Sequence, residues 1–140
     1  DLGARMANAF AEAFRRGARR VAIIGTDVPW VSRKTVVGAL AALDRCDVVI
    51  GPAHDGGYYL LAAKTPRPEM FAEIAWSTPS VLTATLARCA ELNLSVRQLD
   101  LLTDIDALGD IRGVWSRLEP LLARRSPRTA AVLKARLTLA

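Results

Sequence analysis

Residues 21–30 read VAIIGTDVPW, a short apolar run that stops at a glycine and is followed at once by a carboxylate. The run 21–24 is typical of a short strand buried on both faces of a sheet. Ligands of open α/β sheets bind just beyond the carboxyl ends of strands, so Asp27 would lie at that rim. Pro29 prevents further sheet pairing because its ring fixes φ and removes a donor. Asp27 is therefore a candidate functional residue, with capping of the next turn as the alternative, since aspartate is common in turns.

Helices and strands are expected to alternate on both sides of this stretch. Apolar residues recur at four-residue spacing over 2–16 and predict a helix before it. A second helix with Ser32 as its N-cap and a second buried strand over 47–51 follow it. Such alternation indicates parallel strands joined by right-handed crossovers. The sequence therefore predicts an α/β fold.

The second half of the chain predicts a hairpin and then further helices. Residues 58–63 read as a third strand that turns back on the second, because only a short loop separates the two. Residues 76–79 are expected to enter the next helix, with a hydroxyl side chain as the N-cap and Pro79 at the first helical position. The remaining expected elements are a fourth strand over 95–99, a helix capped by Asp106 and a last helix over about 129–139.

Composition indicates a soluble, cytoplasmic protein. With 140 residues, 51% hydrophobic and 24% charged, residues 1–140 are expected to form a single globular domain. No apolar run approaches the ~20 residues needed to cross a bilayer, so no membrane partner is expected. Cys46 and Cys89 are far apart and form neither a zinc motif nor a disulfide framework, which favours a reducing compartment.

The net charge of +5 does not by itself indicate nucleic-acid binding. The basic residues cluster at probable helix ends, where cations complement the helix dipole, and no aromatic residues are interleaved with them. We therefore expect no nucleic-acid partner. An anionic small substrate would suit the charge equally well.

Three acidic clusters follow predicted strands or lie in tight loops. They are Asp27, then Asp55, then Asp104 with Asp106 and Asp110. A parallel sheet would gather them at one rim, where converging carboxylates repel one another unless a cation is present. Mg²⁺ or Mn²⁺, held by one or two carboxylates plus substrate phosphates, is the usual solution.

The loop that contains Asp55 has two adjacent glycines, Gly56 and Gly57. Glycine allows positive φ and a close approach of a ligand to the backbone. The alternative is a plain hairpin turn, because Asp-Gly is a strong turn signal. Tyr58 and Tyr59 would point to opposite faces of the strand that follows, so one could line a pocket while the other packs.

Five strings occur in the order of one known family. They are DLGARM (1–6), GTDVP (25–29), GPAHDGGYY (51–59), WST (76–78) and DID (104–106). With them the chain resembles the bacterial proteins described as glycosyltransferase-like or radical-SAM/selenodomain-associated transferases. These belong to the glycosyltransferase-A nucleotide-diphospho-sugar transferase superfamily. The likeness covers residues 1 to about 110 and implies a three-layer, Rossmann-like mixed sheet.

The resemblance also implies roles for individual residues. Asp27 would be the metal-binding aspartate that holds Mg²⁺ or Mn²⁺ against nucleotide phosphates, and Asp106 or Asp104 the second ligand. Asp55 would be the catalytic residue on the acceptor side. The implied substrate-binding residues are Gly25, Thr26, Gly56, Gly57, Tyr58, Trp76, Ser77 and Thr78.

One part of the family pattern is not in this stretch. The family's nucleotide-binding element, an N-terminal strand followed by a glycine-rich basic loop, would precede residue 1. The sheet is therefore expected to lack its first strands, and its exposed edge would need covering, for example by a homo-oligomer.

The leading hypothesis is a metal-dependent transferase with a nucleotide or nucleotide-sugar donor and a small-molecule acceptor. The metal would neutralise the diphosphate leaving group while the pocket positions the acceptor. The alternatives are a truncated or degenerate non-catalytic domain that keeps the fold, and a nucleotidyltransferase of the same fold.

Overall fold

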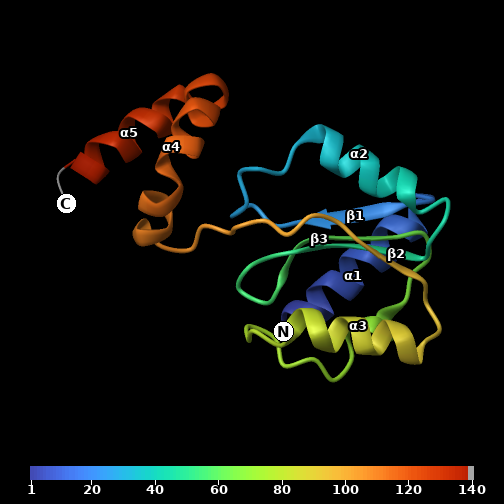
Figure 1. The fold of residues 1–140 in the computed structure, drawn as a ribbon. Coiled ribbons are helices and arrows are strands. Elements are labelled where there is room, and N and C mark those ends of the chain that lie inside the picture. Colours follow the sequence, from blue (N-terminus) through green and yellow to red (C-terminus); the bar gives the residue numbers. More distant parts are fainter. Residues whose placement is uncertain (139–140) are drawn as a thin grey trace. The chain divides into compact units, whose positions relative to one another are not determined.

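The computed structural model describes residues 1–138, which divide into two compact units (Figure 1). The first unit is Asp1–Asp104 and the second begins at Ile105. The first contains a mixed sheet covered by helices, which confirms the expected α/β fold, and the described part of the second is a pair of helices. No helix among the described residues is long and apolar enough to cross a membrane. The expectation of a single domain over residues 1–140 stays a prediction.

The sheet of the first unit has four strands in the order β1-β3-β2-β4. The strands are β1 (Val21–Ile24), β2 (Val48–Pro52), β3 (Tyr58–Ala63) and β4 (Val96–Gln98). Strand β3 lies between β1 and β2 and is antiparallel to both, whereas β2 and β4 are parallel. The expected hairpin of the second and third strands is confirmed. Strands β1 and β2 run in the same direction, as expected, but β3 separates them.

The two central strands carry the core on both faces. Every residue of β2 is buried, and so is every residue of β3 except Tyr58. Because side chains alternate along a strand, Val48 and Ile50 pack on one face while Val49 packs on the other. The first face is covered by helices α1 (Leu2–Arg15), η1 (Pro68–Phe71, a 3-10 turn) and α3 (Val81–Glu91), and the second by α2 (Arg33–Ala42) (Figure 1).

Local hydrogen bonds explain where the first two helices begin. Helix α1 matches the predicted helix, and the Asp1 side chain accepts a hydrogen bond from the backbone N–H of Ala4 at 2.8 Å. The predicted N-cap Ser32 is confirmed, because its hydroxyl accepts from the N–H of Thr35 at 3.1 Å. The Thr35 hydroxyl in turn accepts from the N–H of Ser32, which completes a capping box.

The ends of three strands are joined through Asp47, the residue before β2. Its carboxylate accepts hydrogen bonds from the N–H and the hydroxyl of Ser95, at 2.9 and 2.5 Å, just before β4. It also forms an ion pair at 3.0 Å with Lys64, which follows β3. The Ser95 hydrogen bonds, followed by the contact with Lys64, lower the pKa of Asp47 to about 2.

The second unit contains helices α4 (Leu108–Arg125) and α5 (Pro127–Thr138), which contact each other. Leu118 of α4 and Ala130 of α5 are buried, and Lys134 of α5 forms an ion pair with Glu119 of α4 at 2.8 Å. The expected last helix is present as α5, although it begins at Pro127, and its expected end at residue 139 lies outside the described residues.

Two expected helix caps are wrong. Helix α3 begins only at Val81, two residues beyond Pro79, and the residue at its N-cap position is Ser80, whose side chain forms no capping hydrogen bond. Helix α4 has Ala107 and not Asp106 at its N-cap position. The carboxylate of Asp110 accepts hydrogen bonds from the N–H of Ala107 at 2.7 Å and of Asp106 at 3.1 Å, so the cap comes from inside the helix.

Candidate functional site

Three loops of the first unit meet at one rim of the sheet. They follow β1, join β2 to β3, and follow β4. The last two are tied together by hydrogen bonds, because Leu102 donates its N–H to the carbonyl of Pro52 and accepts from the N–H of His54, both at 3.1 Å. The N–H of Gly25 donates to the carbonyl of Tyr59 at 2.8 Å and ties the loop after β1 to the same rim. The structure thus forms the rim that the sequence predicted.

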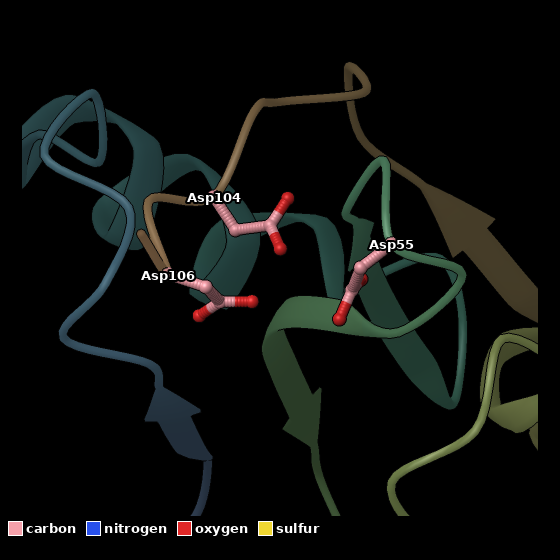
Figure 2. A group of neighbouring side chains, drawn as sticks. All are labelled: Asp55, Asp104 and Asp106. Atoms are coloured by element: carbon pink, nitrogen blue, oxygen red, sulfur yellow. The ribbon is translucent and has the colours of Figure 1, made fainter. Parts of the chain in front are cut away.

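The rim carries an acidic group. Carboxylate oxygens of Asp55, Asp104 and Asp106 lie within 4.8 Å of one another (Figure 2). Asp55 comes from the β2–β3 loop and Asp104 from the segment after β4, so this pair belongs entirely to the first unit. Asp106 follows two residues later, in the second unit, and we therefore base the site on Asp55 and Asp104.

The donor set of this group fits a hard divalent cation. Its ligand atoms are all carboxylate oxygens, which suit Mg²⁺ or Mn²⁺ better than zinc, since zinc sites favour histidine and cysteine. One oxygen of Asp55 accepts a hydrogen bond from the N–H of Gly57 at 2.8 Å, and this contact holds its side chain in place. The exposed carboxylate of Asp55 and the half-buried carboxylate of Asp104 repel each other at this distance, and a cation would relieve that repulsion.

Asp27 lies at the same rim but is not a member of this group among the described residues. It is exposed, just after β1. Together with Gly25, Thr26 and Tyr58 it lines a separate cavity of about 350 Å³ beside β1. Four of the predicted site residues thus lie together, away from the acidic group. The expected role of Asp27 as a metal ligand stays a prediction.

The double glycine allows close packing of protein against protein. Gly56 has φ +89°, and a Cβ atom there would lie 2.1 Å from the carbonyl oxygen of Pro79. The carbonyl of Gly56 accepts a hydrogen bond from the N–H of Leu82, in the first turn of α3, at 2.9 Å. The loop that carries Asp55 is therefore fastened to the start of α3. A substrate contact for Gly56 and Gly57 stays a prediction.

The two tyrosines lie on opposite faces of β3, as predicted. Tyr59 packs on the α2 side, and its hydroxyl donates to the carbonyl of Asp100 at 3.1 Å. Tyr58 packs on the other side, and its hydroxyl is buried near Thr85 and Cys89, where the Thr85 side chain is close enough to interact with it but makes no hydrogen bond of normal geometry. Burial raises the pKa of Tyr58 to about 12.

The string over 76–78 supports the packing of the first unit. The Trp76 ring lies against Gly3, where a Cβ atom would come within 2.5 Å of the indole. The centroids of the Trp76 and Phe71 rings are 6.3 Å apart. Thr78 donates its hydroxyl to the carbonyl of Ala75 at 2.7 Å, which closes the turn that contains Ser77. The expected acceptor contacts of Trp76, Ser77 and Thr78 stay predictions.

Comparison with known proteins places the chain in a family. A model of the bacterial family described as "Uncharacterized protein conserved in bacteria (DUF2064)" matches residues 1–78. The chain belongs to the DUF2064 family. The matched region contains Asp27 and Asp55, whereas Asp104 and Asp106 follow it.

A solved structure extends the likeness of this DUF2064 chain beyond residue 78. It is the crystal structure of a protein from Desulfovibrio desulfuricans G20 described as a "putative nucleotide-diphospho-sugar transferase". The two have a TM-score of 0.87 and 35% sequence identity, over 99% of this chain and 61% of that one. The chain thus spans about three fifths of that protein's length. No curated protein matches. The nucleotide-diphospho-sugar transferase fold implied by the sequence resemblance is confirmed.

One feature of this DUF2064 chain was missed at the level of sequence. A cavity of about 450 Å³ lies on the α2 side of the same rim. Its walls include Trp30, Tyr59 and Leu102, and the side chains of Lys34 and Arg97 also line it. The sequence signal was Trp30, an aromatic residue at the end of the 21–30 stretch. The other four lining residues named above come from three separate segments of the chain, so only the folded structure shows that they lie beside Trp30.

Proposed function

We propose that this chain acts as a metal-dependent transferase that takes a nucleotide-sugar donor and a small-molecule acceptor. The observation that carries the proposal is the convergence of Asp55 and Asp104 oxygens within 4.8 Å at the rim of the sheet. The likeness to the Desulfovibrio protein supports the donor class, because that protein is described as a nucleotide-diphospho-sugar transferase. The string GPAHDGGYY at 51–59 supports the finer assignment to the radical-SAM/selenodomain-associated transferases.

Asp55 and Asp104 are the residues that would hold Mg²⁺ or Mn²⁺, with Asp106 as a further ligand. When bound, the ion would neutralise charge on the diphosphate leaving group. Hydrogen bonds hold both residues in place. The N–H of Gly57 donates to the carboxylate of Asp55 at 2.8 Å, and the Trp30 indole donates to the backbone carbonyl of Thr103, next to Asp104, at 2.9 Å. Asp55 is also the residue expected to face the acceptor, and rigid positioning would serve that role equally.

Calorimetric titration of Mn²⁺, first alone and then with a panel of nucleotide sugars, tests the proposal. Asp55→Asn and Asp104→Asn each remove one carboxylate charge, and we expect each to weaken Mn²⁺ binding at least about tenfold. Asp100→Asn is the matched control, because Asp100 is an exposed aspartate that follows β4 but lies outside the acidic group. Equal weakening in all three variants would indicate a general charge effect and not a site.

The same titration separates the transferase from the two alternatives. A folded wild-type chain that binds neither Mn²⁺ nor any nucleotide sugar would favour a non-catalytic domain. Release of pyrophosphate from a nucleoside triphosphate, with no release of a nucleoside diphosphate from a nucleotide sugar, would favour a nucleotidyltransferase. Transfer to an acceptor with release of the nucleoside diphosphate is the expected result.

A further inference from the structure

The cavity on the α2 side of the rim has a composition that points to a ligand. Its volume of about 450 Å³ falls within the usual range of small-molecule sites, roughly 300 to 1,000 Å³. All of its lining residues lie between Trp30 and Leu102, inside the first unit. Apolar and aromatic side chains form part of the wall, and polar side chains form the rest, among them two cations and one carboxylate. Such a mixture is typical of a pocket in which a few polar groups orient an otherwise apolar ligand.

Two walls of the cavity are held rigidly. The Trp30 indole donates its N–H to the carbonyl of Thr103 at 2.9 Å, and the Tyr59 hydroxyl donates to the carbonyl of Asp100 at 3.1 Å. Tyr59 is 3% exposed. Its ring lies directly against Gly51, because a Cβ atom on Gly51 would come within 2.5 Å of the ring. Both aromatic rings therefore keep their positions without a ligand.

Two of the polar side chains left over for a ligand are cationic, and Gln98 adds a neutral amide to the wall. The hydroxyls of Ser32 and Thr35 are 3.0 Å apart and already used in the capping box of α2. Lys34 and Arg97 line the same cavity from α2 and β4, and their side chains have no hydrogen bond or ion pair with any residue that the structure describes. Some other cations of the first unit are paired, as in Arg20 with Asp44 and Lys64 with Asp47, so the feature that sets Lys34 and Arg97 apart is that both line one cavity.

We propose that this cavity binds a small molecule with an anionic group, a phosphate or carboxylate, on an apolar or aromatic body. Lys34 and Arg97 neutralise the anion, and Trp30 packs against the body. Two unpaired cations that converge on one concave wall attract and orient an anion in this way. Asp100 is the one carboxylate among the lining residues, so the wall keeps a net positive charge.

From the position of the cavity we infer that this ligand is the acceptor of the transferase. That identification rests on the proposed function, whereas the binding of an anionic ligand does not. Leu102 lines the cavity, and Asp104 of the acidic group follows two residues later. Trp30 contacts the backbone between them through its hydrogen bond to Thr103. A ligand held by Lys34 and Arg97 could thus extend toward Asp104.

Binding of phenyl phosphate, measured by calorimetry in the presence of EDTA, tests the inference. EDTA removes divalent ions, so the outcome is independent of the acidic group. We expect the wild type to bind phenyl phosphate and to bind phenol at least about tenfold more weakly, because phenol lacks the anion. Lys34→Gln and Arg97→Gln should each weaken phenyl phosphate binding about tenfold, and Asp100→Asn should tighten it.

Arg33→Gln is the matched control for the two cation variants. Arg33 is an exposed cation beside Lys34 on α2 but does not line the cavity, so its removal should leave the dissociation constant unchanged. Equal weakening by Arg33→Gln would mean general attraction to a basic surface and would overturn the proposal. Absence of phenyl phosphate binding by the wild type would overturn it as well.

Replacement of Trp30 by leucine separates the aromatic wall from the charges. We expect Trp30→Leu to weaken phenyl phosphate binding by roughly two- to tenfold and to leave the binding of inorganic phosphate unchanged. Loss of both would show that Trp30 only supports the fold, and retention of both would remove Trp30 from the site. A wild type that binds phenyl phosphate but neither Mn²⁺ nor any nucleotide sugar would overturn the transferase proposal and leave the cavity proposal standing.

Discussion

Single residues at the rim differ in their role: the polar group of some is buried in the packing, whereas that of others is exposed and available to bind a ligand. Tyr58 shows the first case, because its hydroxyl is buried near Thr85 of α3, without a hydrogen bond of normal geometry, and cannot reach a ligand from that position. Lys34 and Arg97 show the second, because both are exposed in a cavity without a partner among the described residues. Asp55 belongs to both, since one of its oxygens holds a turn and its carboxylate also joins the acidic group.

Removal of the buried Tyr58 hydroxyl should stabilise the protein. A buried polar group without a partner costs about 1–3 kcal/mol, so Tyr58→Phe should raise the free energy of unfolding by about 1 kcal/mol. Tyr59→Phe is the control and should lower it by about 1 kcal/mol, because the Tyr59 hydroxyl donates to the carbonyl of Asp100. Urea unfolding measures both. A stability loss in Tyr58→Phe would mean that the contact with the Thr85 side chain acts as a stabilising hydrogen bond.

Asp27 is the residue where function and turn capping predict opposite outcomes. If it binds a metal, Asp27→Asn should abolish metal-dependent nucleotide binding and change the free energy of unfolding by less than about 1 kcal/mol, as is typical of an exposed position. Calorimetry and thermal unfolding together decide. Intact nucleotide binding with a large loss of stability would assign Asp27 to the turn.

At the scale of elements, loops and helices contact each other closely at glycine positions, where a Cβ atom would clash with the neighbouring segment. Gly56 packs on Pro79 before α3, and Gly3 of α1 packs on Trp76. The Gly56 contact holds the β2–β3 loop, and with it Asp55, at a defined place on the rim, whereas the Gly3 contact joins α1 to the segment before α3.

Gly56→Ala should destabilise the first unit. The added methyl group would meet the Pro79 carbonyl and must also adopt φ +89°, so we expect a loss of at least about 2 kcal/mol in the free energy of unfolding. Gly38→Ala is the control, because Gly38 lies inside α2 with open space around it, and should gain about 0.5–1 kcal/mol. Thermal unfolding of both variants measures these changes. An unchanged stability in Gly56→Ala would contradict the packing role of Gly56.

The cluster of Asp47, Ser95 and Lys64 should make stability depend on acid pH. The pKa of Asp47 is lowered from 3.8 to about 2 in the folded protein, so its contribution is complete above about pH 4 and is lost as the pH falls toward 2. The side chain is 31% exposed, so the contribution is about 1 kcal/mol or less. Urea unfolding of wild type and Asp47→Asn should differ near neutral pH and converge at low pH. A difference that persists at low pH would contradict this assignment.

At the scale of the whole molecule, the sheet has one edge that is poorly covered. The residues of β1 are only partly buried and Ile24 is 46% exposed, and within residues 1–138 β1 pairs with a strand on one side only. Leu2 of α1, 50% exposed, lines the cavity beside it. An uncovered apolar edge of this kind favours pairing with another strand.

Self-association of this chain through β1 is the expected consequence. Analytical ultracentrifugation should show a concentration-dependent homo-oligomer, and Ile24→Lys should convert it to a monomer because a charge at the edge opposes pairing. Val37→Lys, at another exposed apolar position on α2, is the control and should leave the association unchanged. A wild type that stays monomeric at every concentration would make the prediction wrong.

The sequence by itself determined what depends on neighbours along the chain. Four-residue spacing of apolar side chains determined α1, the hydroxyl of Ser32 determined the start of α2, and the short Asp-Gly-Gly loop determined the hairpin of β2 and β3. The order of five short strings was enough to indicate the family and its fold.

Only the tertiary structure decided which distant residues meet. The insertion of β3 between β1 and β2 is a matter of strand order, and it left Asp27 outside the group that Asp55 and Asp104 form. The burial of Tyr58 and the convergence of Lys34 with Arg97 were decided in the same way. Contacts between residues far apart in sequence depend on how layers pack, and local periodicity carries no information about that packing.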